Sequence, residues 1–185
     1  IMSQETSGAA APLGAAVPLE AAAPESELSM TLLMTPDKAN FSGNVHGGQM
    51  LKLLDEVAYA CASRYSSRYV VTLSVDQVLF KEPIRIGELV TFLAAVNFTG
   101  RTSMEIGIKV VAESVTQKER RHAMTCYFTM VAVDENGKSV TVPELPLTTP
   151  ERRQRHAAAS LRRDLRREVM ERYAAIKRAG IDTTG

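Results

Sequence analysis

DKANFSGNVHGG, at residues 37–48, is a loop rich in Asn, Gly and Ser that leads directly into QMLKLLDEVAYACASR at residues 49–64. In the second segment, apolar side chains recur at the three- and four-residue spacing of an α-helix and cover more than half of its circumference. These apolar residues are Met50, Leu51, Leu53, Leu54, Val57, Ala58, Cys61 and Ala62. The polar residues form only a narrow stripe, so the sequence predicts one helix that the rest of the chain largely surrounds.

The segments after this helix have the composition of β-strands. Four long strands are predicted at residues 69–80, 89–99, 103–115 and 122–133, because β-branched and aromatic residues are frequent there. Pro83 and Gly87 separate the first two strands, Gly100 and Arg101 form a hairpin turn, and DENG at 134–137 forms a final turn. A short strand near residues 28–33 precedes the loop. An apolar helix and a meandering antiparallel sheet bury each other most simply when the sheet curls around the helix, which gives an α+β fold.

The two ends of the chain differ from this central part. Residues 1–26 are rich in Ala and Pro and contain no Lys or Arg, so we expect a disordered extension rather than a signal peptide. Residues 149–185 are predicted to form a basic surface helix and a tail, with ten Lys or Arg against four Asp or Glu between residues 151 and 180. The globular domain is therefore expected at residues 27–148. The whole chain carries a net charge of only +1.

The cysteines and the hydropathy restrict the compartment and the partners. Cys61 and Cys126 lie in apolar runs without the spacing of metal ligands, so we expect buried free thiols and a cytoplasmic location. No apolar run approaches the roughly 18 residues of a membrane span, so no membrane partner is expected. We expect neither a metal nor a cofactor.

The start of the predicted helix offers the best place for chemistry. Gly47 and Gly48 let a ligand approach the backbone closely, and the first N–H groups of a helix have no partners within the helix. These groups form either an oxyanion site for a carbonyl or a simple tight entry turn. Asp55 follows Gly48 by two helical turns. It is either a general base at the edge of a cleft or a solvated acid paired with Lys52 or Tyr59.

Three other polar residues allow a structural interpretation. Asn40 is either a turn-former or a group that orients a water or a thioester oxygen. His46 has no partner carboxylate at motif spacing, so a structural role is expected. Glu56 lies within the polar stripe and is expected to be solvated. For the glycine pair, Asp55 and Asn40, the pattern alone favours the structural interpretation.

Three segments, in the right order, resemble the acyl-CoA hydrolase branch of the hotdog-fold thioesterases, which includes brain-type cytosolic acyl-CoA hydrolase and bacterial YciA-like enzymes. The segments are PDKANFSGNVHGGQMLKLLDE at 36–56, VTLSVDQVLFKEPIRIGE at 71–88 and FTGRTSMEIGIKV at 98–110. The resemblance covers residues 28–147. It implies a hotdog fold, in which a curled antiparallel sheet surrounds one central helix, and hydrolysis of fatty acyl-CoA to free fatty acid and CoA.

The resemblance also implies roles for individual residues. The family's catalytic asparagine falls on Asn40 and its catalytic aspartate on Asp55. The thioester carbonyl would lie at the N–H groups of Gly47 and Gly48, Asp55 would act as base or nucleophile, and Asn40 would orient water or substrate. In relatives the asparagine and the aspartate come from different subunits of a dimer, and dimers assemble into hexamers as trimers of dimers. Because this chain has one such domain, we expect a homo-oligomer, at least a dimer and as a further expectation a hexamer.

Contacts with CoA are implied at two places. Arg101, Thr102 and Ser103 match the family's G-R-[ST]-S turn, which contacts the pantetheine and phosphate region, and arginine suits a diphosphate because of its fork of donors. The alternative is a hairpin turn with exposed polar residues. The basic segment would either add contacts to the 3′-phosphate or be a solvated helix; the arginines concerned are Arg152, Arg153 and Arg155.

Three other functions remain open. A hotdog hydratase or dehydratase would need a histidine paired with an acid, and His46 lacks that context. A non-catalytic acyl-CoA-binding or regulatory module would bind its ligand without turnover. Nucleic-acid binding by the arginine-rich segment would require salt-dependent binding that is lost on truncation after Pro150. That segment lacks an interleaved series of aromatic residues for base stacking, so no nucleic-acid partner is expected.

Overall fold

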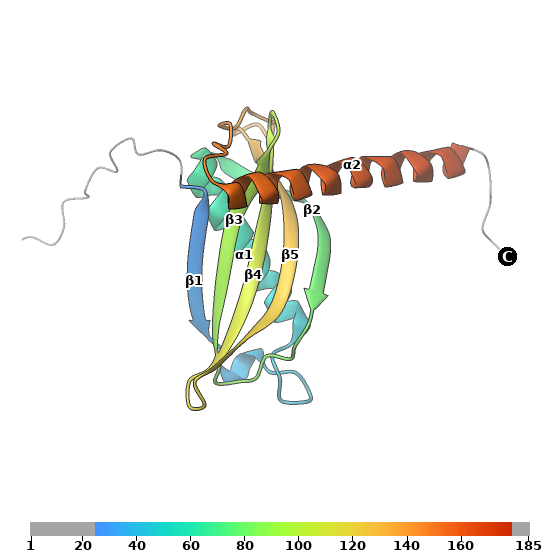
Figure 1. The fold of residues 1–185 in the computed structure, drawn as a ribbon. Coiled ribbons are helices and arrows are strands. Elements are labelled where there is room, and N and C mark those ends of the chain that lie inside the picture. The colour runs from blue at the N-terminus through green and yellow to red at the C-terminus, as the bar shows by residue number, and fades with distance from the viewer. Residues whose placement is uncertain (1–24, 179–185) are drawn as a thin grey trace, which may run out of the picture.

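The computed structural model describes residues 25–178, which form one five-stranded sheet and two long helices (Figure 1). Of the expected N-terminal extension, only residues 25 and 26 are described, and the predicted tail lies outside the described residues from 179 onward. The elements, in chain order, are β1 (Glu27–Leu33), the 3-10 helix η1 (Pro36–Lys38), α1 (Gly47–Ser66), β2 (Tyr69–Phe80), β3 (Leu89–Thr99), β4 (Ser103–Ser114), β5 (Glu119–Val133) and α2 (Pro150–Arg178).

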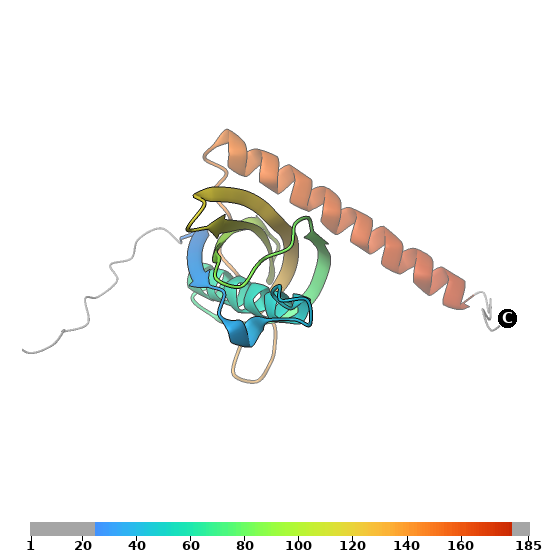
Figure 2. The same cartoon turned by 90° about the horizontal axis from the view of Figure 1, so that it is seen from below.

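The sheet is antiparallel throughout and has the strand order β1-β3-β4-β5-β2. Viewed along the strands it forms an arc around α1, with α2 on the outside of the arc (Figure 2). This arrangement confirms the predicted fold, in which a curled sheet surrounds one helix. It also leaves β2, a strand of 12 residues, at one edge of the sheet.

The element boundaries agree closely with the sequence prediction, with one exception. The last strand was expected to begin at residue 122, but β5 begins at Glu119, because Glu119, Arg120 and Arg121 continue the ladder with β4. Because these three residues are polar, the composition of the sequence did not predict a strand there. This end of the β4–β5 hairpin is exposed and needs no apolar side chains. The turn predicted at 134–137 is present: Asp134 accepts hydrogen bonds from the N–H groups of Asn136 and Lys138.

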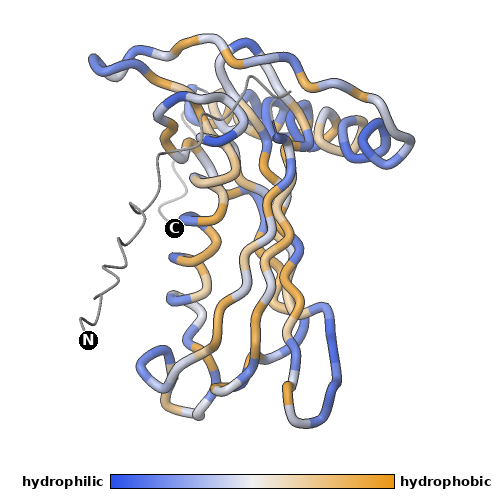
Figure 3. The backbone as a smooth tube through the Cα atoms, turned by 90° about the vertical axis from the view of Figure 1, so that its left-hand side faces the viewer, coloured by the Kyte–Doolittle hydropathy of each residue, from blue (hydrophilic) through white to orange (hydrophobic). Residues whose placement is uncertain are grey.

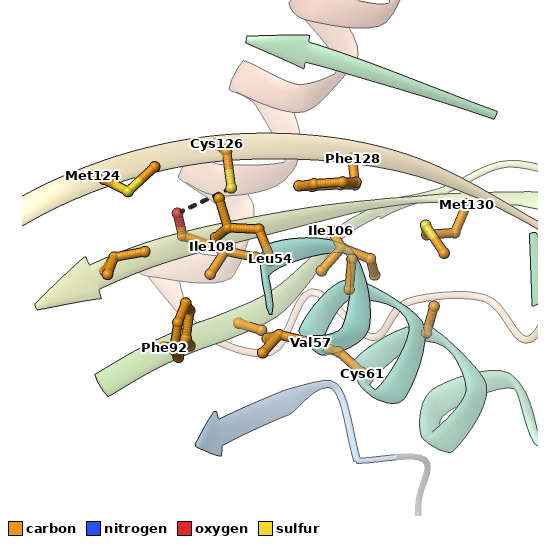
Figure 4. Packing of buried hydrophobic residues seen from close by; sticks show 14 of the residues in the cluster. Leu54, Val57, Cys61, Phe92, Ile106, Ile108, Met124, Cys126, Phe128 and Met130 are labelled. Carbon is orange, nitrogen blue, oxygen red and sulfur yellow. Dashed lines mark hydrogen bonds between the residues drawn. The ribbon is translucent and has the colours of Figure 1, made fainter. Parts of the chain in front are cut away.

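The core lies between α1 and the concave face of the sheet. Figure 3 shows hydrophobic residues along the strands and on the side of α1 that faces them, while the hydrophilic residues gather in the loops and on the opposite side of α1. In the close view, Ile106, Phe128 and Met130 of the strands approach Val57 and Cys61 of α1 (Figure 4). The side chains fully removed from water include Leu54, Tyr65, Phe92, Met104, Ile108 and Met124. Burial of this apolar face, at roughly 25 cal/mol per Å², explains why α1 is inserted into the arc.

Helix α2 lies on the outer face of the sheet and continues beyond the edge formed by β2 (Figures 1 and 2). Its buried residue among those described is Ala159, and most of the helix is exposed, as expected for a basic surface helix. Neither of the two long helices in the described part of the chain is both long and apolar enough to cross a membrane.

Candidate active site

The loop before α1 is held in shape by the side chain of Asn40. Its Oδ1 atom accepts hydrogen bonds from the N–H groups of Ser42 (2.9 Å) and Asn44 (3.1 Å), and the backbone N–H of Asn40 donates to the carbonyl of Asn44 (2.7 Å). Gly43 completes the turn with a φ of 77°, a conformation that side-chain-bearing residues rarely adopt. The turn therefore uses the amide oxygen of Asn40, and among the described residues its amide nitrogen has no partner. Asn40 is both a turn-former and a free donor.

Asn40 lines a cavity of about 360 Å³ at the N-terminus of α1. Gly47, the first residue of α1, lines the same cavity, at the helix end where N–H groups have no partners within the helix. Phe80, Lys81 and Met124 close other sides. The cavity thus combines a side-chain amide and a helix N-terminus, which suits a carbonyl that gains negative charge.

Gly48, the second glycine expected at the oxyanion site, has a partner for its N–H group within the chain. Its N–H group donates to Nδ1 of His46 at 2.9 Å, so His46 is the N-cap of α1. The expectation of a structural role for His46 is met. The oxyanion role stays a prediction for both glycines, and the N–H of Gly47 is the one without a hydrogen-bond partner among the described residues.

Asp55 lies on α1 two turns further along, where it faces β2. The hydroxyl of Thr72 donates to Oδ1 of Asp55 at 2.6 Å. The expected structural pairing with Lys52 is absent, since Lys52 approaches Glu56 instead, at 3.9 Å. Glu56 is exposed, as expected. A second, open cavity of about 350 Å³ is lined by Asp55, Glu56, Tyr59 and residues 69–72.

Asn40 and Asp55 therefore belong to different cavities, which have no lining residue in common. Eight residues separate Gly47 from Asp55 on α1, which corresponds to a rise of about 12 Å. Helical side chains tilt toward the N-terminus, but this tilt recovers only part of that distance. A single thioester carbonyl needs its oxyanion donor at about 3 Å and its base within one water molecule. One chain alone does not bring the two predicted catalytic residues together.

The cavity at Asn40 is supported by an ion pair at the start of β3. Glu88, buried at this point, accepts two hydrogen bonds from the Arg121 guanidinium (2.8 and 2.7 Å) and one from the N–H of Arg85 (2.8 Å). Burial on its own would raise the pKa of Glu88, but the bonds from Arg121 and Arg85 outweigh it and hold the pKa below its ordinary value. Arg85 in turn forms a β-bridge with Asn44. This chain of contacts fixes the loop of Asn40 to the sheet, and sequence patterns gave no sign of it.

The turn predicted to bind CoA lies at the other end of the sheet. Its backbone is fixed, because Arg101 accepts a hydrogen bond from the N–H of Val142 and Thr102 accepts one from Ala132. Ser103 lines a third cavity, of about 560 Å³, between the outer face of the sheet and α2. The arginines that share this cavity are Arg163, Arg166 and Arg167.

The three arginines that were expected near the CoA phosphates lie in the first turns of α2 and contact other parts of the chain. Arg155 pairs with Glu27 of β1 (2.6 Å), and Arg153 donates to the carbonyl of Leu147 (3.0 Å). Arg152 contacts the hydroxyl of Thr148 at 3.5 Å. They do not line the cavity at Ser103, whose arginines are Arg163, Arg166 and Arg167.

Residues 25–178 were also compared with the requirements of a cysteine nucleophile and of a metal site. Burial raises the pKa of Cys126 to about 12, and burial, with a smaller effect of Glu27, does the same for Cys61, so neither thiol is an activated nucleophile. No cluster of His, Cys, Asp and Glu in this part of the chain could hold a metal ion.

Comparison with known proteins identifies related sequences. The family model of the thioesterase superfamily matches residues 42–119. Protein VdlD of Helicobacter pylori is 47% identical over 144 residues, which are 78% of this chain and 82% of that protein. YkhA of Bacillus subtilis, named an uncharacterized acyl-CoA thioester hydrolase, is 33% identical over 84% of this chain and 90% of its own length. The human cytosolic acyl coenzyme A thioester hydrolase is 36% identical over 70% of this chain, which corresponds to 35% of that longer protein.

Solved structures have the same fold. An acyl-CoA hydrolase from Bacillus cereus is 35% identical, with a TM-score of 0.76 over 87% of this chain and 97% of that one. A hexameric acyl-CoA thioesterase is 33% identical, with a TM-score of 0.74 over 84% and 94%. The acyl-CoA hydrolase of Staphylococcus aureus, solved with butyryl coenzyme A and coenzyme A, is 26% identical, with a TM-score of 0.75 over 85% and 96%. Alanine variants of that enzyme replace an asparagine, an aspartate 15 residues later and a threonine 17 residues after the aspartate.

Proposed function

This chain belongs to the thioesterase superfamily, among its acyl-CoA thioester hydrolases, and from this premise we propose that it hydrolyses fatty acyl-CoA at a site shared between two copies of the chain. Asn40 and Gly47 of one copy bind the thioester carbonyl, and Asp55 of the other copy promotes its hydrolysis. Thr72 positions Asp55.

The observation that carries this proposal is the position of the two cavities along the edge strand β2. Thr72 and its neighbours near the start of β2 line the cavity of Asp55, while Phe80 at the end of β2 lines the cavity of Asn40. When two β2 strands pair antiparallel around a two-fold axis, the start of one strand lies beside the end of the other. The pairing therefore brings Asp55 of each copy toward Asn40 of its partner and forms two equivalent sites.

The edge itself supports such a pairing. β2 pairs with β5 on one side only, and the free side of such a 12-residue edge strand is an open template for another strand, which proteins normally shorten, charge or cover. Here it carries exposed apolar side chains instead: Tyr69, Val71, Leu73, Val75, Leu79 and Phe80. Relatives that are solved as hexamers make a larger assembly of such dimers the expected state of this chain.

The residues chosen for substitution in the Staphylococcus aureus hydrolase support the assignment. Asn40, Asp55 and Thr72 have the same residue types and the same spacings of 15 and 17 as the asparagine, aspartate and threonine replaced there. Thr72 was not assigned a role from the sequence, and its hydrogen bond to Asp55 now explains why a hydroxyl is placed there.

In the proposed reaction, the thioester carbonyl accepts a hydrogen bond from the Gly47 N–H and lies near the free amide nitrogen of Asn40. Asp55 of the partner copy either takes a proton from water, which attacks the carbonyl carbon, or attacks that carbon itself. In both routes the C–S bond breaks, CoA leaves as the thiol after protonation, and water supplies the oxygen that completes the free acid. His46 is occupied as a helix cap, which argues against a histidine-dependent hydratase.

The turn Arg101, Thr102 and Ser103 is proposed to contact CoA beyond the reacting carbon, with phosphate contacts from the basic helix. Because Ser103 shares its cavity with Arg163 and Arg167, these two join Arg152, Arg153 and Arg155 as candidates for the phosphates. The name of the human relative supports a cytoplasmic reaction.

A mixing experiment tests the shared site. Asn40→Ala and Asp55→Ala chains, each nearly inactive alone, are co-expressed with different tags, and palmitoyl-CoA hydrolysis is followed by CoA release. In a random mixture half of the dimers are mixed, and each mixed dimer has one intact site, so about one quarter of wild-type activity returns. If the site lay within one chain, no activity would return, and the proposal would be wrong. Tight binding of palmitoyl-CoA by the wild-type chain without turnover would also contradict it.

A further inference from the structure

Helix α2 contacts the strands of the sheet one after another, from one edge to the other. Near its start Arg155 pairs with Glu27 of β1, and His156 stacks on Phe98 of β3. Arg162 then pairs with Glu105 of β4 and lies over the ring of Tyr127 on β5. Arg166 bonds to Thr129 of β5 and to Ser74 and Asp76 of β2. The helix thus reaches the edge strand at Arg166.

Twelve further residues, Arg167–Arg178, follow Arg166 in α2. In the first turn, Arg167 and Met170 still line the cavity over Leu73 and Ser74 of β2, and the helix then continues past that edge. The rise of these twelve residues is about 18 Å, and Figures 1 and 2 show this half of α2 projecting beyond β2. Within the described chain, the hydrogen bonds and ion pairs of these residues stay inside α2. A projecting half-helix with no partner lacks the tertiary packing from which helices in proteins gain most of their stability.

The side of α2 that faces the sheet becomes apolar in this projecting half. Ala159, Arg162 and Arg166 face the sheet at three- and four-residue steps. The same steps lead on to residues 169–170, 173 and 176. The exposed fractions there are large: Val169 45%, Met170 63%, Tyr173 65% and Ile176 47%. Exposed large apolar residues in one continuous stripe mark a surface that another surface covers.

We propose that Arg167–Arg178 is an arm that packs this apolar stripe against a second copy of the chain, across the paired β2 strands. The inference rests on the dimer in the proposed function, since pairing at β2 continues the sheet beneath the projecting half. Strands lie about 4.8 Å apart, so 18 Å of helix reaches across three to four strands of the partner. The contact face of α2 would then be covered from end to end by one continuous surface.

The charges of the arm favour this partner over a membrane surface. Its four cations, Arg167, Arg172, Lys177 and Arg178, are mixed with Glu168 and Glu171, and both of the ion pairs recorded for the arm lie within α2. A helix that binds anionic lipid presents a predominantly cationic polar face. A protein surface with polar and apolar areas therefore matches the arm better than an anionic lipid surface does.

Photocrosslinking tests the arm in the full-length chain. The photoreactive residue p-benzoylphenylalanine replaces Tyr173, and in a control chain it replaces Leu161, which is 60% exposed but lies on the half of α2 over its own sheet. Heavy-isotope and unlabelled chains are co-refolded, irradiated and digested. We expect crosslinks that join heavy to light peptides at position 173 and not at position 161. The proposal would be overturned if position 173 gave crosslinks only within one chain or gave none. It would also be overturned if the chain bound phosphatidylglycerol vesicles and position 173 formed no crosslinks between chains.

The result of the crosslinking experiment can be distinguished from the result of the mixing experiment that tests the proposed function. If mixed Asn40→Ala and Asp55→Ala chains regain activity but position 173 does not crosslink, the shared site stands and the arm is wrong. If position 173 crosslinks but activity does not return, the arm stands and the shared site is wrong. In addition, Met170→Asp combined with Tyr173→Asp is expected to raise the dissociation constant of the dimer at least about tenfold by sedimentation, whereas Leu161→Asp leaves it unchanged; equal effects would overturn the proposal.

Discussion

The hydroxyl of Thr72 on β2 donates a 2.6 Å hydrogen bond to Oδ1 of Asp55 on α1. This bond fixes the carboxylate relative to the edge strand and leaves Oδ2 free to act on water or substrate. Because β2 is also the strand expected to pair with a second copy, the bond links the position of the proposed base to the interface that completes the site.

Thr72→Val removes the donor while keeping the shape of the side chain. We expect kcat for palmitoyl-CoA to fall about 10- to 100-fold, because a hydrogen bond to a charged group contributes about 1.5–3 kcal/mol. KM and the assembly state are expected to stay near wild type, since the hydroxyl that is removed is bonded to Asp55. Thr72→Ser restores the hydroxyl and should recover most of the activity; a serine variant as slow as the valine variant would contradict the role of the bond.

Asp55→Asn and Asn40→Ala are each expected to lower kcat by about 10²–10⁴, the range for loss of a base or an oxyanion donor. Glu56→Gln is the matched control, since Glu56 is the neighbouring acid and only approaches Lys52. It should keep nearly full activity. Steady-state hydrolysis across acyl-chain lengths, with assembly checked by sedimentation, measures all three. Full activity in folded Asp55→Asn would end the catalytic assignment.

His46→Ala tests whether the histidine is a cap or a base. Loss of the bond to the Gly48 N–H should cost about 1 kcal/mol of stability and lower Tm by a few degrees. Since the cap lies beside Gly47, kcat should change by only a few-fold, and His46→Asn should recover the stability. A loss of about 10² or more in kcat with a normal Tm would instead make His46 a catalytic base.

The sequence predicts the architecture well because it depends on periodicity. The apolar face of α1 and the β-branched and aromatic composition of the strands predict the elements that form the core, and the structure confirms both. Two contacts at the candidate site, in contrast, join residues that are far apart in the sequence. Thr72 meets Asp55 17 residues away, and the bond depends on which strand lies beside α1, so no local pattern reveals it. For the same reason no local pattern predicted the Glu88–Arg121 pair. The bond from the Gly48 N–H to the ring of His46, although local, was not predicted either.

Glu88→Gln should weaken the support of the Asn40 loop in a pH-dependent way. At pH 7 we expect about 2–3 kcal/mol of lost stability, because the bonds from Arg121 lose their ionic character. In the folded chain the pKa of Glu88 is lowered from its ordinary value of 4.5. The stability that ionised Glu88 contributes is therefore fully present above pH 4.5 and is lost as the pH falls through the lower pKa of the folded state. Urea unfolding at pH 7 and pH 3 measures the difference. A difference between wild type and variant that grows toward pH 3 would contradict this account.

The pair of Arg162 on α2 and Glu105 on β4 is expected to hold α2 on the sheet as a unit. Glu105 is only 4% exposed and accepts two hydrogen bonds from Arg162, at 2.6 and 3.1 Å. Glu105→Leu alone leaves a largely buried guanidinium without its counterion, which should cost about 2–4 kcal/mol and speed tryptic cleavage within α2. Glu105→Leu together with Arg162→Met removes both charges and should recover at least half of that loss, since well-packed apolar residues often replace a buried ion pair at little cost. Urea titrations at one protomer concentration give the coupling. If the double variant is as unstable as the sum of the two single variants, the pair does not act as a unit, and α2 is held by its other contacts.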